Sequence, residues 1–181
     1  MPMIKDESVA LVIAGRAIQY FEFDKFFQEC KRVLKPNGVV AYFSSDHARF
    51  VIENHPTKAD KLNELFRKLR EVDTAGFWEG QIGIKQRKYA DIHLPFDDVK
   101  EIRDNSIFKM SKMSLSDLLT LFKSVPAFVK FKSVRGQEVW DGLERDFVHN
   151  FLAILELPVS TDLSSVILDV SHDYFVIMAR K

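Results

Sequence analysis

The residues best suited to binding a small molecule lie in one irregular stretch of the sequence. From Thr74 to Asp98 neither a helical nor a strand pattern holds, and long irregular segments inside compact domains are often functional. The stretch gathers aromatic and hydrogen-bonding side chains at Trp78, Arg87, Tyr89, His93 and Phe96. The alternative for each of them is structural, because aromatic rings also anchor loops and an arginine also serves as a solvated charge.

Other chemistry finds little support in the residue types. The sequence has five histidines without the close ligand spacing of a zinc site: His47, His55, His93, His149 and His172. Ser171, His172 and Asp173 are the residue types of a hydrolase triad, but sequence neighbours cannot reach the relay geometry. The one cysteine, Cys30, falls on the apolar face of a predicted helix, which is typical of a small core residue. We therefore expect no metal site and no cysteine nucleophile.

A strand, a helix and a second strand are predicted at the start of the chain. Residues 8–15 have the unbroken apolar run of a buried strand. Apolar residues then recur at helical spacing, with Glu22 or Asp24 as the N-cap. The helix ends in Lys-Pro-Asn-Gly, where Pro36 removes a donor and Gly38 supplies a permissive backbone. The apolar run that follows completes a parallel crossover with helices on both sides.

Three further helices and two strand patterns follow. The first helix is predicted to be capped at Thr57 and the second at Ser114, and the third runs from about Gln137 to Leu155. The segments SSVILDV and YFVIMARK near the end read as strands. A polar Ser-His-Asp separates them, so they form either a hairpin or one interrupted strand.

Composition favours one globular domain. Hydrophobic residues make up 46% of the 181 residues, and 26 basic side chains balance 26 acidic ones. No overall basic field attracts nucleic acid or an anionic membrane, and no apolar run approaches the roughly twenty residues of a bilayer span. The sequence opens with no charged-then-apolar leader, so the cytoplasm is the expected location.

Several segments follow, in order, the pattern of one enzyme family. The run DESVALVIAGRAIQYFEFDKFFQECKRVLKPNGVVAYFSSD contains a strand, a segment like A-A-Q-A-x-H-W-F-D, an amphipathic helix and a turn like R-V-L-K-P-G-G. Downstream come KYADIHLPFDDV, MSLSDLLTLFKSVPAFVKF and YFVIMARK. Together they resemble class I S-adenosylmethionine-dependent methyltransferases of the methyltransferase type 11 kind, close to the trans-aconitate methyltransferase-like group.

The resemblance implies an α/β fold: a partial Rossmann-like methyltransferase sheet, strands four onward, with helices on both faces and a helical insertion. Residues 1–181 would form one N-terminally truncated domain, and residues 52–160 would include the insertion that covers the substrate. The family's glycine-rich cofactor loop and its ribose-binding acidic residue have no counterpart in this sequence. Weak or absent binding of S-adenosylmethionine is therefore expected for this chain, as a fragment, a truncated gene product or a protein that has lost the activity.

The resemblance also implies site residues. Ala14, Gly15 and Arg16 fall at the carboxyl end of a parallel strand, where open α/β sheets bind ligands, so they are expected to border the cofactor. An ordinary strand-to-helix turn is the alternative. The irregular segment described first resembles the substrate-covering region, and its five candidate residues would bind the methyl acceptor. A carboxylate acceptor would be held by Arg87 or Arg16 through paired hydrogen bonds.

Three hypotheses on function follow. The complete form is a methyltransferase acting on a small molecule, the chain is a binding module, or it is a pseudoenzyme. Without the first strand, Val9 to Ala14 would be an edge strand that lacks proline, lysine and an obvious bulge. Self-association or a partner strand is expected at this edge, unless Met1 to Glu7 covers it.

Overall fold

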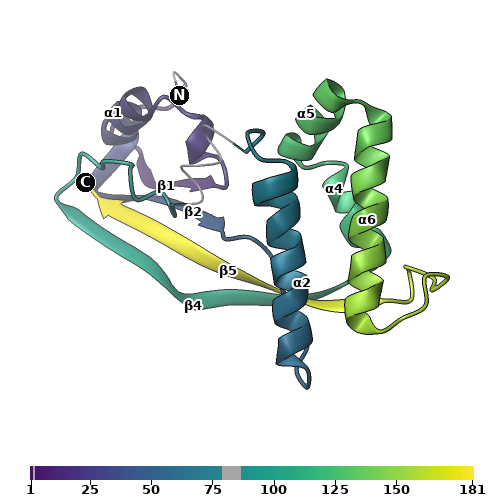
Figure 1. Cartoon of the computed structure of the whole chain (residues 1–181). Helices are drawn as coiled ribbons and strands as arrows, with labels where there is room; N and C mark the ends of the chain where they lie inside the picture. The colour runs from purple at the N-terminus through teal and green to yellow at the C-terminus, as the bar shows by residue number, and fades with distance from the viewer. Residues whose placement is uncertain (2, 79–86) are drawn as a thin grey trace. The chain divides into compact units, whose positions relative to one another are not determined.

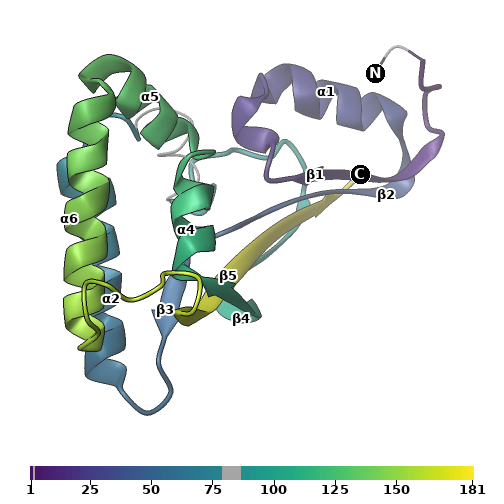
Figure 2. The same ribbon diagram turned by 90° about the vertical axis from the view of Figure 1, so that its right-hand side faces the viewer.

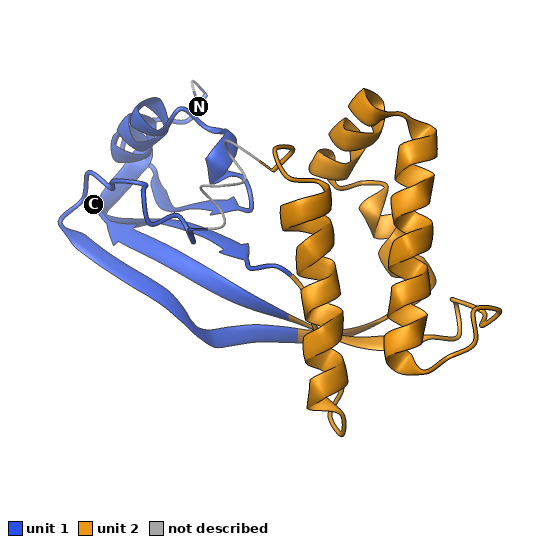
Figure 3. Cartoon of the chain, in the orientation of Figure 1, with its two compact units in different colours: residues 1–47, 80–109, 172–181 blue, residues 48–79, 110–171 orange. Residues whose placement is uncertain are grey.

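The computed structural model describes residue 1, residues 3–78 and residues 87–181 of the chain (Figure 1). Residues 79–86 of the irregular segment lie outside the described residues. The chain divides into two units (Figure 3). Unit 1 comprises Met1–His47, Gly80–Lys109 and His172–Lys181, and unit 2 comprises Ala48–Glu79 and Met110–Ser171.

Unit 1 is built on the predicted parallel crossover. Its first elements are β1 (Val9–Gly15), the short 3-10 helix η1 (Ile18–Tyr20), α1 (Phe23–Val33) and β2 (Leu34–Ser45). β1 and β2 run parallel, with Ala14 opposite Tyr42, and α1 lies against one face of the pair (Figure 2). The helix is capped at Glu22 by backbone geometry and buries Phe27 and Cys30. The strand, the helix and the second strand are thus confirmed.

The Lys-Pro-Asn-Gly segment after α1, at the beginning of β2, obtains its shape differently from the prediction. The residue in the left-handed conformation is Asn37, with φ 64°, rather than Gly38. Gly38 is needed for space instead, because a Cβ there would lie 2.9 Å from the backbone oxygen of Lys35. Asparagine tolerates the left-handed region better than most residues. Asn37 therefore supplies the positive φ of this segment, and Gly38 supplies the space that a Cβ would fill.

The sheet has the order β1-β2-β5-β3, and β4 also pairs with β5. The additional strands are β3 (Arg49–Val51), β4 (Asp98–Ser114) and β5 (Ile167–Arg180). β5 is antiparallel to both β2 and β3. The two strand patterns near the end of the sequence therefore form one continuous strand, and β1 is an edge of the sheet, as predicted.

Both cores use β5. Leu168 and Val170 pack in the core of unit 2, whereas Phe175, Ile177 and Ala179 pack in the core of unit 1. Each unit thus packs its own helices on the part of β5 that it contains. The predicted α/β fold class, with helices on both faces of a sheet, is confirmed.

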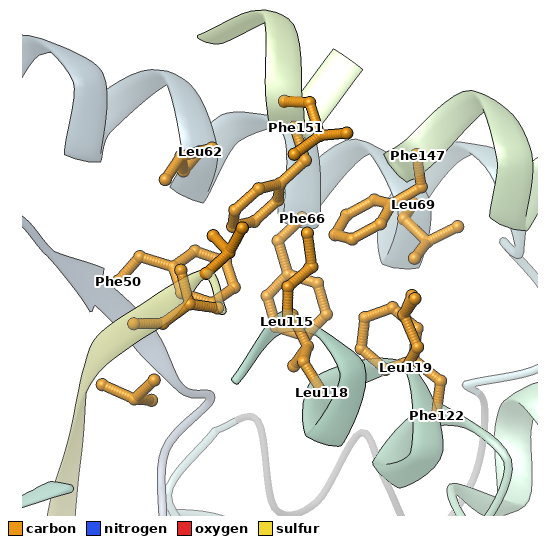
Figure 4. Close-up of a cluster of buried hydrophobic side chains, with 14 of the residues drawn as sticks. Phe50, Leu62, Phe66, Leu69, Leu115, Leu118, Leu119, Phe122, Phe147 and Phe151 are labelled. Atoms are coloured by element: carbon orange, nitrogen blue, oxygen red, sulfur yellow. The ribbon is translucent and has the colours of Figure 1, made fainter. Parts of the chain in front are cut away.

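The helices of unit 2 enclose an aromatic core. They are α2 (Pro56–Lys68), the π-helical turn η2 (Leu69–Asp73), α4 (Leu115–Phe122), α5 (Pro126–Arg135) and α6 (Gln137–Leu155). Phe66 of α2 stacks on Phe122 of α4 at 5.6 Å between ring centroids, and Phe147 of α6 lies edge-on to both (Figure 4). Within the described ranges, no helix is long and apolar enough to cross a membrane.

The start of α2 corrects one prediction. Pro56 is the first helical residue and His55 is the N-cap, so Thr57 is inside the helix and does not cap it. Proline is favoured at this first position because its missing N–H has no helical partner there. By contrast Ser114 caps α4 as predicted, and the bounds of α6 agree with the predicted ones.

Candidate functional site

The carboxyl ends of the parallel strands β1 and β2 lie together in unit 1. Gly15 is paired with Phe43, and the backbone N–H of Arg16 donates to the carbonyl oxygen of Phe43 at 2.8 Å. Arg16 has φ 54°, so the chain turns sharply away from the sheet at this residue. Ala14 is buried, whereas Gly15 and Arg16 are exposed. The three residues predicted to border a cofactor therefore occupy the expected strand end.

The absence of a side chain at Gly15 leaves room for the ring of Phe43. A Cβ at this position would lie 2.8 Å from Cζ of Phe43, so the ring of Phe43 covers the glycine. A larger residue would displace this ring from the exposed face of the strand pair.

A buried hydrogen-bond chain holds the turn after β1. Gln19 of η1 donates through Nε2 to the backbone oxygen of Arg16 at 3.0 Å, and the Tyr89 hydroxyl donates to Oε1 of Gln19 at 2.5 Å. Gln19 is 8% exposed and Tyr89 is fully buried. Burial raises the pKa of the Tyr89 hydroxyl, and the nearby Ser44 hydroxyl lowers it by less, so Tyr89 keeps the proton that it donates.

Two further hydroxyl groups are buried on β2. Tyr42 and Ser44 are both fully buried on one face of the strand; the Tyr42 hydroxyl has no hydrogen-bond partner in the described part of the chain, and the Ser44 hydroxyl lies beside that of Tyr89. Burial raises the pKa of Tyr42, so this group also stays protonated. Unpaired buried polar groups are costly and therefore mark places where a ligand or a water molecule binds. Ser44, near the Tyr89 hydroxyl, is a buried polar group of the unit 1 core behind this strand end.

The candidate residues of the irregular segment differ in whether they reach the strand end. Of its candidate residues, Tyr89 reaches the strand end, where its ring packs on Tyr42 at 5.8 Å and on Phe175 at 5.1 Å. Phe96 is in the same core but packs against α1, edge-on to Phe27 at 6.2 Å and beneath the Lys31 ammonium. The structure thus makes Tyr89 a support for the strand-end turn.

Arg87 and His93 lie on the surface of unit 1. The guanidinium of Arg87 forms an ion pair with Asp91, four residues further along the chain, and both side chains are exposed. His93 is exposed between two buried residues, Ile92 and Leu94. Neither is joined to the strand end by the contacts that the structure gives, and their proposed role in acceptor binding stays a prediction.

Trp78 belongs to unit 2. Its indole Nε1 donates to the Thr74 hydroxyl at 2.8 Å, and its ring lies edge-on to Phe128 at 5.2 Å. Thr74 in turn donates to the backbone oxygen of Leu69 at 2.8 Å. These contacts hold the indole at the end of η2, so Trp78 has a structural role. Its predicted role in acceptor binding stays a prediction.

The strand end offers positioning groups rather than a catalytic set. The described residues contain no group of three His, Cys, Asp or Glu side chains that could hold a metal ion. Burial raises the pKa of the Cys30 thiol to about 12, so Cys30 is a core residue and not a nucleophile. Sequence reasoning missed Gln19 and Ser44. In the sequence, the one feature that could have indicated Gln19 or Ser44 is a polar residue next to apolar ones.

Comparisons with known proteins point to one class of enzyme. A family model described as a methyltransferase domain matches residues 1–42. A Dictyostelium discoideum protein named as a methyltransferase is 22% identical over 178 residues, which cover 96% of this chain and 60% of that protein. The chain therefore spans about three fifths of the length of this relative.

A solved structure has the same fold. It is described as a type II methyltransferase from Anaeromyxobacter dehalogenans, and it matches with a TM-score of 0.73 and 17% identity over 98% of this chain and 66% of its own chain. The predicted resemblance to class I methyltransferases is supported by these comparisons. They do not distinguish a trans-aconitate-like subgroup.

Proposed function

We propose that this chain is part of an S-adenosylmethionine-dependent methyltransferase that transfers a methyl group to a small molecule. The observation that carries the proposal is the match of the methyltransferase family model to residues 1–42. These residues form β1, η1, α1 and most of β2, the elements that build the candidate strand end. The fold likeness over nearly the whole chain supports the same assignment.

The proposed reaction requires placement more than acid or base chemistry. When bound, S-adenosylmethionine supplies an electrophilic methyl group for an in-line displacement, which a protein promotes by holding the acceptor close and excluding water. Ala14, Gly15 and Arg16 would border the cofactor. The strand end fits such a ligand, because Gly15 and Arg16 are exposed there and the chain turns away from the sheet at Arg16. Gln19 would hold the backbone of Arg16 in position.

For a carboxylate acceptor, Arg16 is the better candidate of the two arginines. Arg87 is already paired with Asp91. Arg16 is exposed at the strand end, and its guanidinium has no acidic partner among the residues that the structure describes. A planar guanidinium with free donors can hold a carboxylate through two parallel hydrogen bonds.

This chain alone is expected to bind S-adenosylmethionine weakly or not at all, and to be inactive. Its sequence lacks the glycine-rich loop and the acidic residue that the resemblance assigns to the methionine and ribose moieties. Titration calorimetry on the 181-residue chain would measure this affinity. A dissociation constant in the low micromolar range would contradict the prediction.

A reconstitution experiment tests the proposed function itself. The portion of the Dictyostelium relative outside the aligned region would be co-expressed with this chain as a second polypeptide. We expect the resulting complex to bind S-adenosylmethionine, and Arg16→Ala to weaken binding about tenfold. Arg135→Ala, at the end of α5 in unit 2, is the control and should have no effect. A stable complex that binds no cofactor, or equal effects of both variants, would argue against the assignment.

A binding module that pairs through the sheet edge is the second candidate function. β1 ends the sheet, and its side chains Leu11 and Ile13 remain 49% and 58% exposed. The segment before β1 is held on α1, where Arg32 binds the backbone oxygen of Ile4 at 2.8 Å and forms an ion pair with Asp6. This segment leaves Leu11 and Ile13 uncovered, which favours pairing with another strand.

A further inference from the structure

Unit 2 contains a pocket formed by α4, α5 and α6. Its inner wall consists of three buried aromatic side chains, Phe122, Phe128 and Trp140, and its volume is 440 Å³. Pockets that bind small molecules commonly have about 300–1,000 Å³ and apolar walls. The ring of Phe128 contacts Phe122 at 5.1 Å and Trp140 at 5.3 Å between centroids. The rings therefore hold one another in place, and the pocket is formed without a ligand.

The outer wall of this pocket carries positive charge. Lys123 follows the last residue of α4, Lys132 lies on α5, and both line the pocket. Neither ammonium group has an acidic partner within the described ranges. The sequence between Asp117 and Glu138 contains basic residues and no acidic ones.

The carboxylates next along α6, Asp141 and Glu144, do not line the pocket. Asp141 accepts a hydrogen bond from Gln137 at 2.6 Å, and Glu144 accepts one from the Trp140 indole at 2.8 Å. Both hydrogen bonds lie within α6 and join residues one helical turn apart. Neither carboxylate lines the pocket, so the charged side chains in its lining are the two lysines, beside an apolar interior.

We propose that this pocket binds a small apolar anion. The hydrocarbon body of the ligand would lie against Phe122, Phe128 and Trp140, and its carboxylate or similar acid group would lie between Lys123 and Lys132. Burial of the body supplies affinity, and the two ammonium groups select an acid over a neutral molecule. The proposal depends on contacts within unit 2 alone and is independent of methyl transfer.

Decanoate is a suitable probe, because it combines an apolar chain with one carboxylate. Titration calorimetry with the full chain is expected to show one saturable site for decanoate and weaker binding of the neutral 1-decanol. Lys132→Glu should weaken decanoate binding about tenfold, because it replaces an attractive charge by a repulsive one. Lys130→Glu is the matched control, since Lys130 is on the same helix but does not line the pocket. Its effect should be less than about twofold.

A second pair of variants tests the pocket without changing charge: one is designed to fill it and the other is the control. Val129 lines the pocket and is 49% exposed, so Val129→Trp should occupy it and abolish decanoate binding while the fold is kept. Val134→Trp on the same helix, at a residue that is 63% exposed and outside the pocket, should leave binding unchanged. Absence of saturable binding, equal affinity for acid and alcohol, or equal effects within either pair would overturn the proposal.

Discussion

At the scale of single residues, the hydrogen bond from Tyr89 to Gln19 connects segments 70 residues apart. It completes a chain of donors that ends at the backbone of Arg16. Gln19 and Tyr89 are both buried, so water has little access to the hydrogen bond between them. The shape of the turn after β1 thus depends on a tyrosine far away in the sequence.

Tyr89→Phe removes one hydroxyl and leaves the carbonyl of Gln19 buried without its donor. We expect the free energy of unfolding to fall by about 1–3 kcal/mol, the usual cost of an unsatisfied buried polar group. Urea denaturation followed by circular dichroism would measure the change. Tyr20→Phe is the matched control, because Tyr20 is 58% exposed and its hydroxyl is free to contact water. If both variants lose the same stability, the hydrogen bond to Gln19 contributes little.

The predicted site residues differ in how visible they were in the sequence. Ala14, Gly15 and Arg16 could be placed because a strand end follows directly from the local pattern. Gln19 and Ser44 could not, since their roles arise from a contact with Tyr89, whose position in the fold no local pattern encodes. Tyr89 itself was selected as a loop residue with a polar group, whereas the structure buries it in the core of unit 1.

At the scale of elements, the local sequence was sufficient to predict a helix where one helix face is apolar, and to predict a helix start where the N-cap is a residue such as serine. The helix α6 and the Ser114 cap of α4 are examples. The strand β4 was missed because most of its side chains are exposed and polar, so the alternation of a half-buried strand is absent. Its pairing with β5, including the ion pair of Lys112 with Asp169, joins residues far apart in the sequence, so no local pattern predicts it.

The cap of α4 gives a prediction about one element. Ser114 accepts a hydrogen bond from the backbone N–H of Asp117 at 3.0 Å, and the Asp117 carboxylate accepts from Ser114 in return. Ser114→Ala should lower the free energy of unfolding by about 1 kcal/mol, because helix donors lose their partner. The midpoint of urea unfolding would report it. Ser116→Ala, an exposed change in the same helix, is expected to have little effect, and an equal loss there would exclude a special contribution of the cap.

At the scale of the whole molecule, the open edge of β1 predicts association. An edge strand with exposed apolar side chains and no proline or lysine invites pairing with another strand. The chain should therefore sediment as species larger than a monomer at micromolar concentration. Ile13→Lys should restore the monomer, because a charged residue on an edge strand opposes pairing.

Val159→Lys provides the control for this experiment. It introduces the same charge at a residue that is 70% exposed and outside any strand or helix, so association should persist. A wild-type monomer whose β1 amides exchange freely with solvent would refute the prediction. Equal sedimentation of the two lysine variants would assign the association to another surface.

The position of β5 in the chain also determines the order in which a nascent polypeptide can fold. β1, α1 and β2 are translated first, but the core that they share with Phe175 and Ile177 is incomplete until β5 has been translated. The residues of unit 2 up to Ser171 emerge from the ribosome in the interval. During that interval β2 lacks its antiparallel neighbour, so its edge is open like that of β1, and both strands are exposed to chaperones and to other nascent chains. Unit 1 therefore completes its folding only after the ribosome has reached β5, and its first-made strands depend on the last-made one.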